Sequence, residues 1–257
     1  MKKEKERSES LLLNILPSET AEELKASGDV QPRAYASATV LFTDFKGFTT
    51  IAENMEPEAL VKELHYCFKN FDLIIEKYGL EKIKTIGDAY MCAGGLPHPN
   101  TRHAFDVILA GLAMRDFMES WKQEKEARGE AAWDIRIGIH TGKIVAGVVG
   151  IKKFAYDVWG DTVNTASRME SSGEPGRVNI SGDTYREIKY QFACEGRGKI
   201  QAKNKGEIEM YFVYGFKPKY SRDGAGREPN AEFFEIYKKL KNNARLVPRT
   251  SAPTPAT

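Results

Sequence analysis

The hydrophobic pattern of the chain predicts a short buried strand near its start. Residues 38–43 form an apolar, β-branched run, and Gly47 with two threonines after it marks a turn into a helix. Asp44 therefore stands at the carboxyl end of a strand, just before free backbone N–H groups of the kind that hold phosphates and their metal ions. A helix cap is the other interpretation of such an aspartate, and this stretch alone leaves both open.

A second stretch, residues 81–91, predicts a hairpin that carries another carboxylate. Two short strand patterns meet at Gly87 and Asp88, a pair typical of tight turns. We expect Asp88 to approach Asp44 at neighbouring strand ends. Two carboxylates in this arrangement form a pocket for Mg²⁺ or Mn²⁺, which prefer oxygen ligands. The hairpin thus favours the metal-site interpretation.

The remaining pattern alternates helices and strands. Helices are expected over residues 17–27, 57–78, 101–127, from about 161 to 170, 182–191 and 231–240. Strands are expected over residues 134–142, 143–149, 154–159, 177–181, 199–206 and 209–216. The order strand, helix, hairpin, helix, strand predicts an α+β protein with a ferredoxin-like, palm-type antiparallel sheet and flanking helices.

Two of these elements have side chains that we assign to the core. The helix over 57–78 begins at Pro57 and has an apolar side made of Leu60, Leu64, Phe68, Phe71, Leu73 and Ile75. His140 alternates with apolar neighbours on its strand, which is typical of a hydrogen-bonded core histidine rather than of a catalytic base.

One helix presents a polar pair with chemical potential. Asn164 and Arg168 are four residues apart and so share a face of the helix after Gly160. An amide and a guanidinium together can hold a ribose oxygen and a phosphate. The same spacing also fits an exposed polar stripe.

Composition narrows the class of protein. The 257 residues include 38 basic and 36 acidic side chains, a net charge of +2, so bulk charge does not predict nucleic acid as a partner. Three scattered cysteines predict no disulfide framework and fit a reducing compartment. No apolar run approaches the ~18 residues that span a bilayer. We expect a soluble, cytoplasmic chain, which can still be part of a longer membrane-attached protein.

Taken together, these separated motifs resemble the catalytic domain of a class III adenylyl cyclase, a purine nucleotide cyclase, over residues 35–216. The resemblance implies the class III cyclase fold and the conversion of ATP to 3′,5′-cyclic AMP and pyrophosphate in a signal-transduction protein. In this family the ribose 3′-hydroxyl attacks the α-phosphate with the help of two divalent cations, Mg²⁺ or Mn²⁺.

The resemblance also implies roles for individual residues. Metal ligands would be Asp44, Asp88 and the backbone carbonyl of Phe45, and Asn164 and Arg168 would be catalytic residues that hold the ribose and the α-phosphate in the transition state. The implied phosphate-binding residues are Phe45, Lys46, Gly47, Phe48, Thr49, Lys143 and Lys203.

The implied base-reading pair is Lys84 and Asp157. The ammonium of Lys84 can donate to adenine N1, and the carboxylate of Asp157 can accept from the exocyclic amine. Guanylyl cyclases of this family carry Glu and Cys at these places, so the pair is of the adenine type. Guanylyl cyclase is the alternative enzyme. A degenerate cyclase-like regulatory module is the other alternative, although the metal and catalytic residues are all present.

Family members place the metal aspartates on one subunit and the other site residues on the partner. Because this chain carries both halves, the resemblance implies a head-to-tail homodimer with two interfacial active sites. Residues 1–30 resemble a helical connector to an upstream sensor absent from this chain, although a simple packing helix fits equally well. Residues 217–257 are expected to be a C-terminal extension, partly helical and then disordered. Its end, from Leu246-Val247-Pro248-Arg249 onward, resembles a thrombin recognition sequence left over from protein production.

Overall fold

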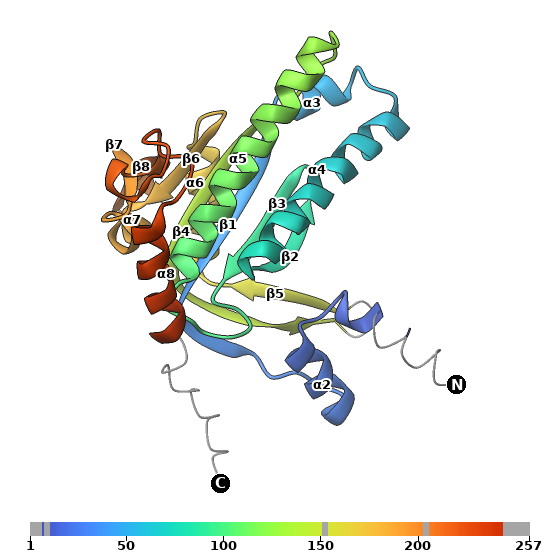
Figure 1. Cartoon of the computed structure of the whole chain (residues 1–257). Helices are drawn as coiled ribbons and strands as arrows, with labels where there is room; N and C mark the ends of the chain where they lie inside the picture. The colour runs from blue at the N-terminus through green and yellow to red at the C-terminus, as the bar shows by residue number, and fades with distance from the viewer. Residues whose placement is uncertain (1–6, 8–10, 151–153, 203–205, 244–257) are drawn as a thin grey trace.

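An eight-stranded sheet organises the protein in the computed structural model, which describes residues 7, 11–150, 154–202 and 206–243 (Figure 1). Its strands are β1 (Arg33–Lys46), β2 (Glu81–Ile86), β3 (Ala89–Gly94), β4 (Asp134–Val149), β5 (Ala155–Trp159), β6 (Arg177–Ser181), β7 (Phe192–Ala202) and β8 (Gly206–Phe216). Its helices are α2 (Ser18–Ser27), α3 (Phe48–Ala52), α4 (Pro57–Tyr78), α5 (His103–Ala127), α6 (Asp161–Ser171), α7 (Gly182–Ile188), the 3-10 helix η1 (Pro218–Tyr220) and α8 (Ala231–Asn243).

The strand order confirms the predicted fold class. Neighbouring strands follow the order β2-β3-β1-β4-β6-β8-β7, and β5 pairs with β4 outside this path. Within the first four strands, each neighbouring pair is antiparallel, and α4 and α5 alternate with these strands, which is the ferredoxin-like arrangement. The pair formed by β4 and β6 is parallel and extends the sheet beyond this core.

Most predicted elements are present, but two strand predictions were wrong. The segments 134–142 and 143–149 form one unbroken strand, β4, whose second half pairs with β5. Gly142 is not a turn here; it is a point of close approach, since a Cβ atom at Gly142 would lie 2.6 Å from Thr162 Oγ1. The strand predicted from residue 199 begins earlier, at Phe192, because it pairs with all of β8.

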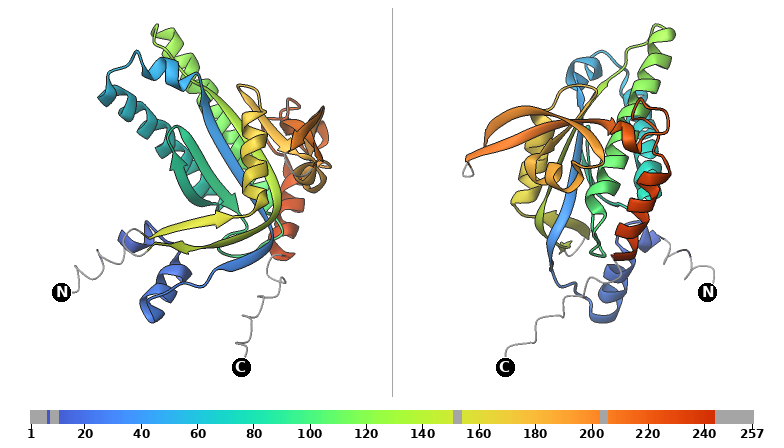
Figure 2. Two further views of the ribbon diagram at one scale, coloured as in Figure 1. Left: turned by 180° about the vertical axis from the view of Figure 1, so that it is seen from behind. Right: turned by 60° about the vertical axis from the view of Figure 1, so that its left-hand side comes forward.

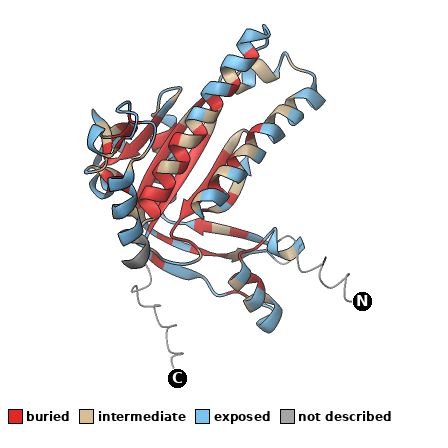
Figure 3. Cartoon of the chain, in the orientation of Figure 1, coloured by how far each residue is buried: buried red, intermediate tan, exposed pale blue. Residues whose placement is uncertain are grey.

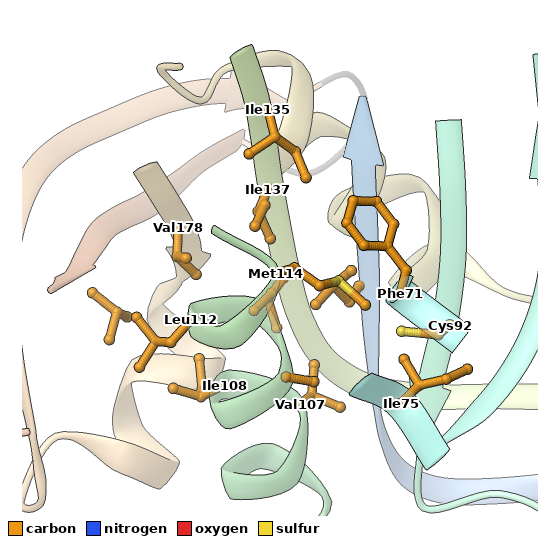
Figure 4. Packing of buried hydrophobic residues seen from close by; sticks show 14 of the residues in the cluster. Phe71, Ile75, Cys92, Val107, Ile108, Leu112, Met114, Ile135, Ile137 and Val178 are labelled. Carbon is orange, nitrogen blue, oxygen red and sulfur yellow. The ribbon is translucent and has the colours of Figure 1, made fainter. Parts of the chain in front are cut away.

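One face of the sheet is covered by α4 and α5 (Figures 1 and 3). Cys67, Phe71 and Ile75 are spaced four apart on α4 and are buried, so one side of the helix faces the core. Figure 4 shows Phe71 and Ile75 beside side chains of α5 and β4. Leu73, assigned to the core from the sequence, is exposed because it lies on the opposite side of α4.

The first half of α5, residues 103–114, is buried on nearly all sides because it lies between the sheet and other helices. The second half buries only one side, through Met118, Trp121 and Lys125. Charged groups in this helix are paired: the side chain of Lys125, for example, contacts Glu63 and, at 3.2 Å, Glu130. Among the described helices, none is long and apolar enough to cross a membrane.

The opposite face of the sheet carries α6 and a second apolar cluster (Figure 2). Val40 and Phe42 of β1 point to this cluster, whereas Leu41 and Phe45 point to the core beneath α5. The apolar run of β1 is therefore continuous because the strand is covered on both faces. Leu16 and Ala21, near the N-terminus, close the second cluster.

The helix after η1, α8, is docked on the start of α5. Phe233 is 1% exposed and its ring lies 4.7 Å from that of Phe216, centroid to centroid. The hydroxyl of Tyr237 donates to Asp106, whose carboxylate also pairs with Arg102 at 3.0 Å. Apolar burial and polar pairing together fix α8 to the domain.

We predict that Phe233→Ala lowers the free energy of unfolding by about 3–5 kcal/mol, because truncating a buried phenylalanine removes its burial energy and leaves a cavity. The neighbouring Phe234 is 47% exposed and is the matched control. Phe234→Ala should change stability by about 0.5 kcal/mol or less. Urea denaturation of both variants measures the difference, and equal effects would show that α8 is not docked as described.

Candidate active site

Asp44 and Asp88 lie side by side at one edge of the sheet. Asp44 is near the end of β1, and Asp88 is in the turn between β2 and β3. Pairing of Thr43 with Tyr90 brings the two strand ends together. Burial and then the neighbouring Asp44 carboxylate raise the pKa of Asp88 above its ordinary value, although the backbone N–H groups of Asp88 and Phe45 partly offset this. The structure thus brings together the two predicted carboxylates.

This pair fits hard divalent cations by its donor chemistry. Both side chains offer only oxygen ligands. The two carboxylates repel each other, as the raised pKa of Asp88 indicates, and a dication between them would remove this repulsion. Within the described residues, no group of three His, Cys, Asp or Glu side chains is arranged to hold a metal. Any ion bound here would need further oxygen ligands, such as phosphate and water.

Sequence reasoning missed two charged residues at this edge, Arg136 and Glu170. Arg136 is directly opposite Asp44 in the register of β1 and β4. Its Nη2 atom lies 2.6 Å from Asp44 Oδ2 and 2.9 Å from Glu170 Oε1. Burial and then the Asp44 charge raise the pKa of Glu170 to about 7. The alternation of Arg136 with buried Ile135 and Ile137 was a usable signal, since it puts Arg136 on the face away from α5.

Close packing of α6 on β4 sets the geometry of this region. A Cβ atom at Gly138 would lie 1.8 Å from the backbone nitrogen of Glu170. Only a residue without a side chain allows the helix backbone to approach the strand so closely. The contact fixes the height of α6 above the sheet and turns Glu170 toward Arg136.

α6 also carries the predicted catalytic pair. Asn164 is exposed and Arg168 is partly exposed, whereas Thr165 and Ala166 are buried against the sheet. The polar pair therefore faces outward from the domain. Among the described residues of one chain, no hydrogen bond or ion pair joins Asn164 or Arg168 to Asp44 or Asp88.

Lys84 and Asp157 form an ion pair between two strands. Lys84 Nζ lies 2.5 Å from Asp157 Oδ2, and the two residues come from β2 and β5. The second carboxylate oxygen of Asp157 accepts a hydrogen bond of 2.8 Å from the backbone N–H of Val158, which orients the side chain. The structure thus joins two residues that are 73 positions apart in the sequence.

The predicted phosphate-binding residues occupy different settings. The Phe45 side chain is buried against Trp133, so only its backbone is available at the site, and Gly47 adopts a left-handed conformation with φ of 76° before α3. Lys46 and Thr49 are exposed, and Phe48 is half-buried. Lys143 is exposed on β4. Lys203 lies outside the described residues.

His140 is a core residue, as predicted. It is 5% exposed, and its Nδ1 atom lies 2.6 Å from Ser181 Oγ. The hydroxyl groups of Thr39, Thr141 and Thr184 continue this buried network at distances of 2.9 and 3.0 Å. These buried polar groups thus serve as hydrogen-bond partners for one another, as is usual for polar side chains in a protein core.

A family model of the adenylate and guanylate cyclase catalytic domain matches residues 30–215. The chain belongs to this family. The cyclase domain is 42% identical over 220 residues to guanylyl cyclase C of Homo sapiens, covering 84% of this chain and 20% of that protein. It is 41% identical over 218 residues to an adenylate cyclase of Mycobacterium tuberculosis (strain ATCC 25618 / H37Rv), covering 84% of this chain and 48% of that protein. The chain thus spans half or less of the length of these relatives.

Solved cyclase structures share the fold. The adenylyl cyclase CyaB from P. aeruginosa aligns with a TM-score of 0.68 and 33% identity, over 72% of this chain and 96% of that one. The catalytic core of a rhodopsin-guanylyl cyclase with converted specificity, in complex with ATPαS, aligns with a TM-score of 0.67 and 34% identity, over 71% and 97%. Residues 30–215 therefore form a nucleotide cyclase catalytic domain, and its relatives include both adenylyl and guanylyl cyclases.

We predict that Gly138→Ala lowers the free energy of unfolding by about 3 kcal/mol, because the new methyl group would force α6 away from β4. Gly196→Ala is the control, since a Cβ atom there would meet only the Tyr211 side chain at 3.7 Å. It should cost below about 1 kcal/mol. Thermal unfolding of both variants measures the effect. A fully stable Gly138→Ala protein would contradict the close packing of α6.

Proposed function

We propose that this chain is an adenylyl cyclase domain that converts ATP to 3′,5′-cyclic AMP and pyrophosphate. The observation that supports this substrate is the pairing of Lys84 with Asp157. An ammonium donor beside a carboxylate acceptor complements adenine, whose edge offers the N1 acceptor and an amine donor. Guanine presents an N1–H donor and an O6 acceptor, so both contacts would be mismatched. Mismatched polar contacts at a buried edge strongly disfavour the wrong base, so this pair would select adenine over guanine.

Guanylyl cyclase is the competing function, because guanylyl cyclase relatives are as similar to this chain as adenylyl cyclase relatives. The Lys84–Asp157 pair argues against guanylyl cyclase activity, because its donor and acceptor do not match the edge of guanine. The catalytic core of a rhodopsin-guanylyl cyclase with converted specificity is in complex with ATPαS, which supports the view that a cyclase domain of this fold can be converted from one base to the other. The assignment to ATP therefore depends on this pair rather than on overall similarity.

In the proposed reaction, Asp44, Asp88 and the backbone carbonyl of Phe45 would hold two divalent cations, Mg²⁺ or Mn²⁺. When bound, such ions lower the pKa of the ribose 3′-hydroxyl and neutralise charge on the phosphates. The backbone of residues 45–49 would receive the phosphates, with the exposed side chains of Lys46 and Thr49 beside them. Lys143 and Lys203 would add positive charge to the triphosphate.

Asn164 and Arg168 would act on the reacting centre. The guanidinium of Arg168 would donate to the α-phosphate oxygens, where negative charge develops in the transition state, and the amide of Asn164 would orient the ribose. Their outward-facing position on α6 leaves both side chains available to a nucleotide held by another subunit. No protein general base is required, since solvent or a substrate phosphate can take the proton.

A head-to-tail homodimer would assemble the complete site twice. Asp44 and Asp88 of one chain would face Lys84, Asp157, Asn164 and Arg168 of the partner. Large apolar side chains are exposed near the base-reading pair, as expected for a surface covered by a partner. These are Ile86, Val145, Val149, Phe154 and Trp159.

The ends of the chain fit roles outside catalysis. The exposed apolar side chains of Leu11, Leu13 and Ile15 support the proposal that residues 1–30 connect the domain to an upstream sensor. In this proposal the cyclase domain works in the cytoplasm. Residues 217–257 would be an extension whose helix α8 stabilises the domain through Phe233.

Substrate choice is tested by giving the purified chain ATP or GTP separately with Mn²⁺ and measuring each cyclic product. We expect cyclic AMP to dominate. The double variant Lys84→Glu, Asp157→Cys should shift the ATP-to-GTP activity ratio by about tenfold or more toward GTP, because the donor and acceptor positions are altered. An unchanged ratio in the double variant would place the base elsewhere, and dominant cyclic GMP from the natural chain would overturn the assignment.

Subunit complementation tests the interfacial site. Asp44→Ala and Arg168→Ala homodimers should each be nearly inactive, because each lacks one half of both sites. In a mixed dimer, one site contains both substitutions and the other site contains neither. Mixing the two variants under conditions of subunit exchange should therefore restore up to about one quarter of wild-type activity. Heterodimers that form but remain inactive would show that each site is built within one chain.

A further inference from the structure

The Arg136 guanidinium contacts a carboxylate assigned above to metal binding. Its Nη2 atom is shared between Asp44 Oδ2 at 2.6 Å and Glu170 Oε1 at 2.9 Å. All three side chains are mostly buried, with exposed fractions of 24% for Asp44, 19% for Arg136 and 11% for Glu170. Solvent therefore screens these charges only partly. The position of Arg136 determines how much negative charge Asp44 can offer to a ligand.

The geometry differs from that of an ion pair built only for stability. An arginine that fixes a carboxylate structurally often uses two parallel N–H donors. Here one nitrogen serves both acids, while the buried Nε atom of Arg136 has no hydrogen-bond partner within the described residues. Glu170 Oε1 likewise makes no hydrogen bond of good geometry there, although it lies within ion-pair distance. The guanidinium is thus divided between its two partners and fully satisfied by neither.

A divalent cation on Asp44 would compete with this guanidinium. Both bind the same carboxylate, and the positive charges of the ion and of Arg136 repel each other. Glu170 offers Arg136 a second carboxylate, so the guanidinium need not be left unpaired when Asp44 is taken. Because Glu170 belongs to α6, held against β4 at Gly138, this alternative partner is fixed in place.

We propose that Arg136 is a positioning residue that sets the metal affinity of Asp44, and that Glu170 limits this competition by holding Arg136. The inference rests on the metal role proposed for Asp44. Neither residue need touch the nucleotide. The two side chains have opposite effects in this arrangement: Arg136 weakens metal binding, whereas Glu170 strengthens it.

The test is a titration of Mn²⁺ alone into the purified 257-residue chain, with free Mn²⁺ measured by electron paramagnetic resonance. Arg136→Met should tighten Mn²⁺ binding by about tenfold, since Asp44 loses its competing cation. Glu170→Gln should weaken it by about fivefold, because Arg136 is then balanced by Asp44 alone. Arg136→Lys keeps the positive charge and should remain within about twofold of the natural protein.

A double-variant cycle separates this role from a structural one. If Glu170 acts through Arg136, Glu170→Gln should lose its weakening effect once Arg136 is Met. Matched controls are Arg128→Met and Glu174→Gln, which remove one charge of each sign from surface ion pairs. Both should leave Mn²⁺ affinity within about twofold. Thermal unfolding of each variant shows whether it is folded. If Arg136→Met does not fold, the comparison of Mn²⁺ affinity between Glu170→Gln and Glu174→Gln decides the proposal.

The outcomes distinguish this inference from the proposed function. Asp44→Asn should abolish the measured Mn²⁺ binding; if it does not, the metal assignment itself is wrong. If Asp44→Asn abolishes binding but Arg136→Met leaves it unchanged or weaker, the metal role stands and the role of Arg136 is refuted. Tighter binding after Glu170→Gln would likewise refute the role of Glu170.

Discussion

The close contact between α6 and β4 at Gly138 is the constraint on which the candidate site depends. Without a side chain at Gly138, the backbone of α6 lies directly on the sheet. With the helix at this distance, Ala166 is buried and Glu170 contacts Arg136. Asn164 and Arg168 then lie on the outward side of α6. One packing contact therefore positions an inward charge network and an outward polar pair together, and a shift of the helix would move both.

β1 links the core to the same site. Leu41 and Phe45 are buried on one face of the strand and Val40 and Phe42 on the other, so the strand is held on both sides. Asp44 lies between Thr43 and Phe45 and shares this rigidity. Phe45 places its ring against Trp133, which leaves its backbone near the end of the strand, beside Asp88. A rigid strand end is what a metal or phosphate site requires, because loosely held ligands lose affinity to entropy.

Local sequence signals predicted the features that depend on residues close together in the chain. The β2–β3 turn was recognisable from Gly87 and Asp88, and the ferredoxin-like order followed from the sequence of elements. The continuity of β4 through Gly142 was not, because a glycine in a strand and one in a turn look alike until the partner helix is known. The Arg136–Glu170 pair and the docking of Phe233 were missed for a similar reason: both depend on contacts between segments distant in the chain.

The proposed base-reading and metal-binding regions share one electrostatic principle. Lys84 pairs with Asp157, and Arg136 pairs with Asp44, so in the free chain these four charged groups are neutralised in pairs. Unpaired charges in these partly buried positions would destabilise the fold. In the proposed enzyme, the nucleotide and its cations must replace these internal partners, so binding strength is a difference between two sets of contacts. The proposed selectivity for adenine would follow from the same difference, because a purine with reversed donors and acceptors cannot replace the Lys84–Asp157 contact without leaving both groups unsatisfied.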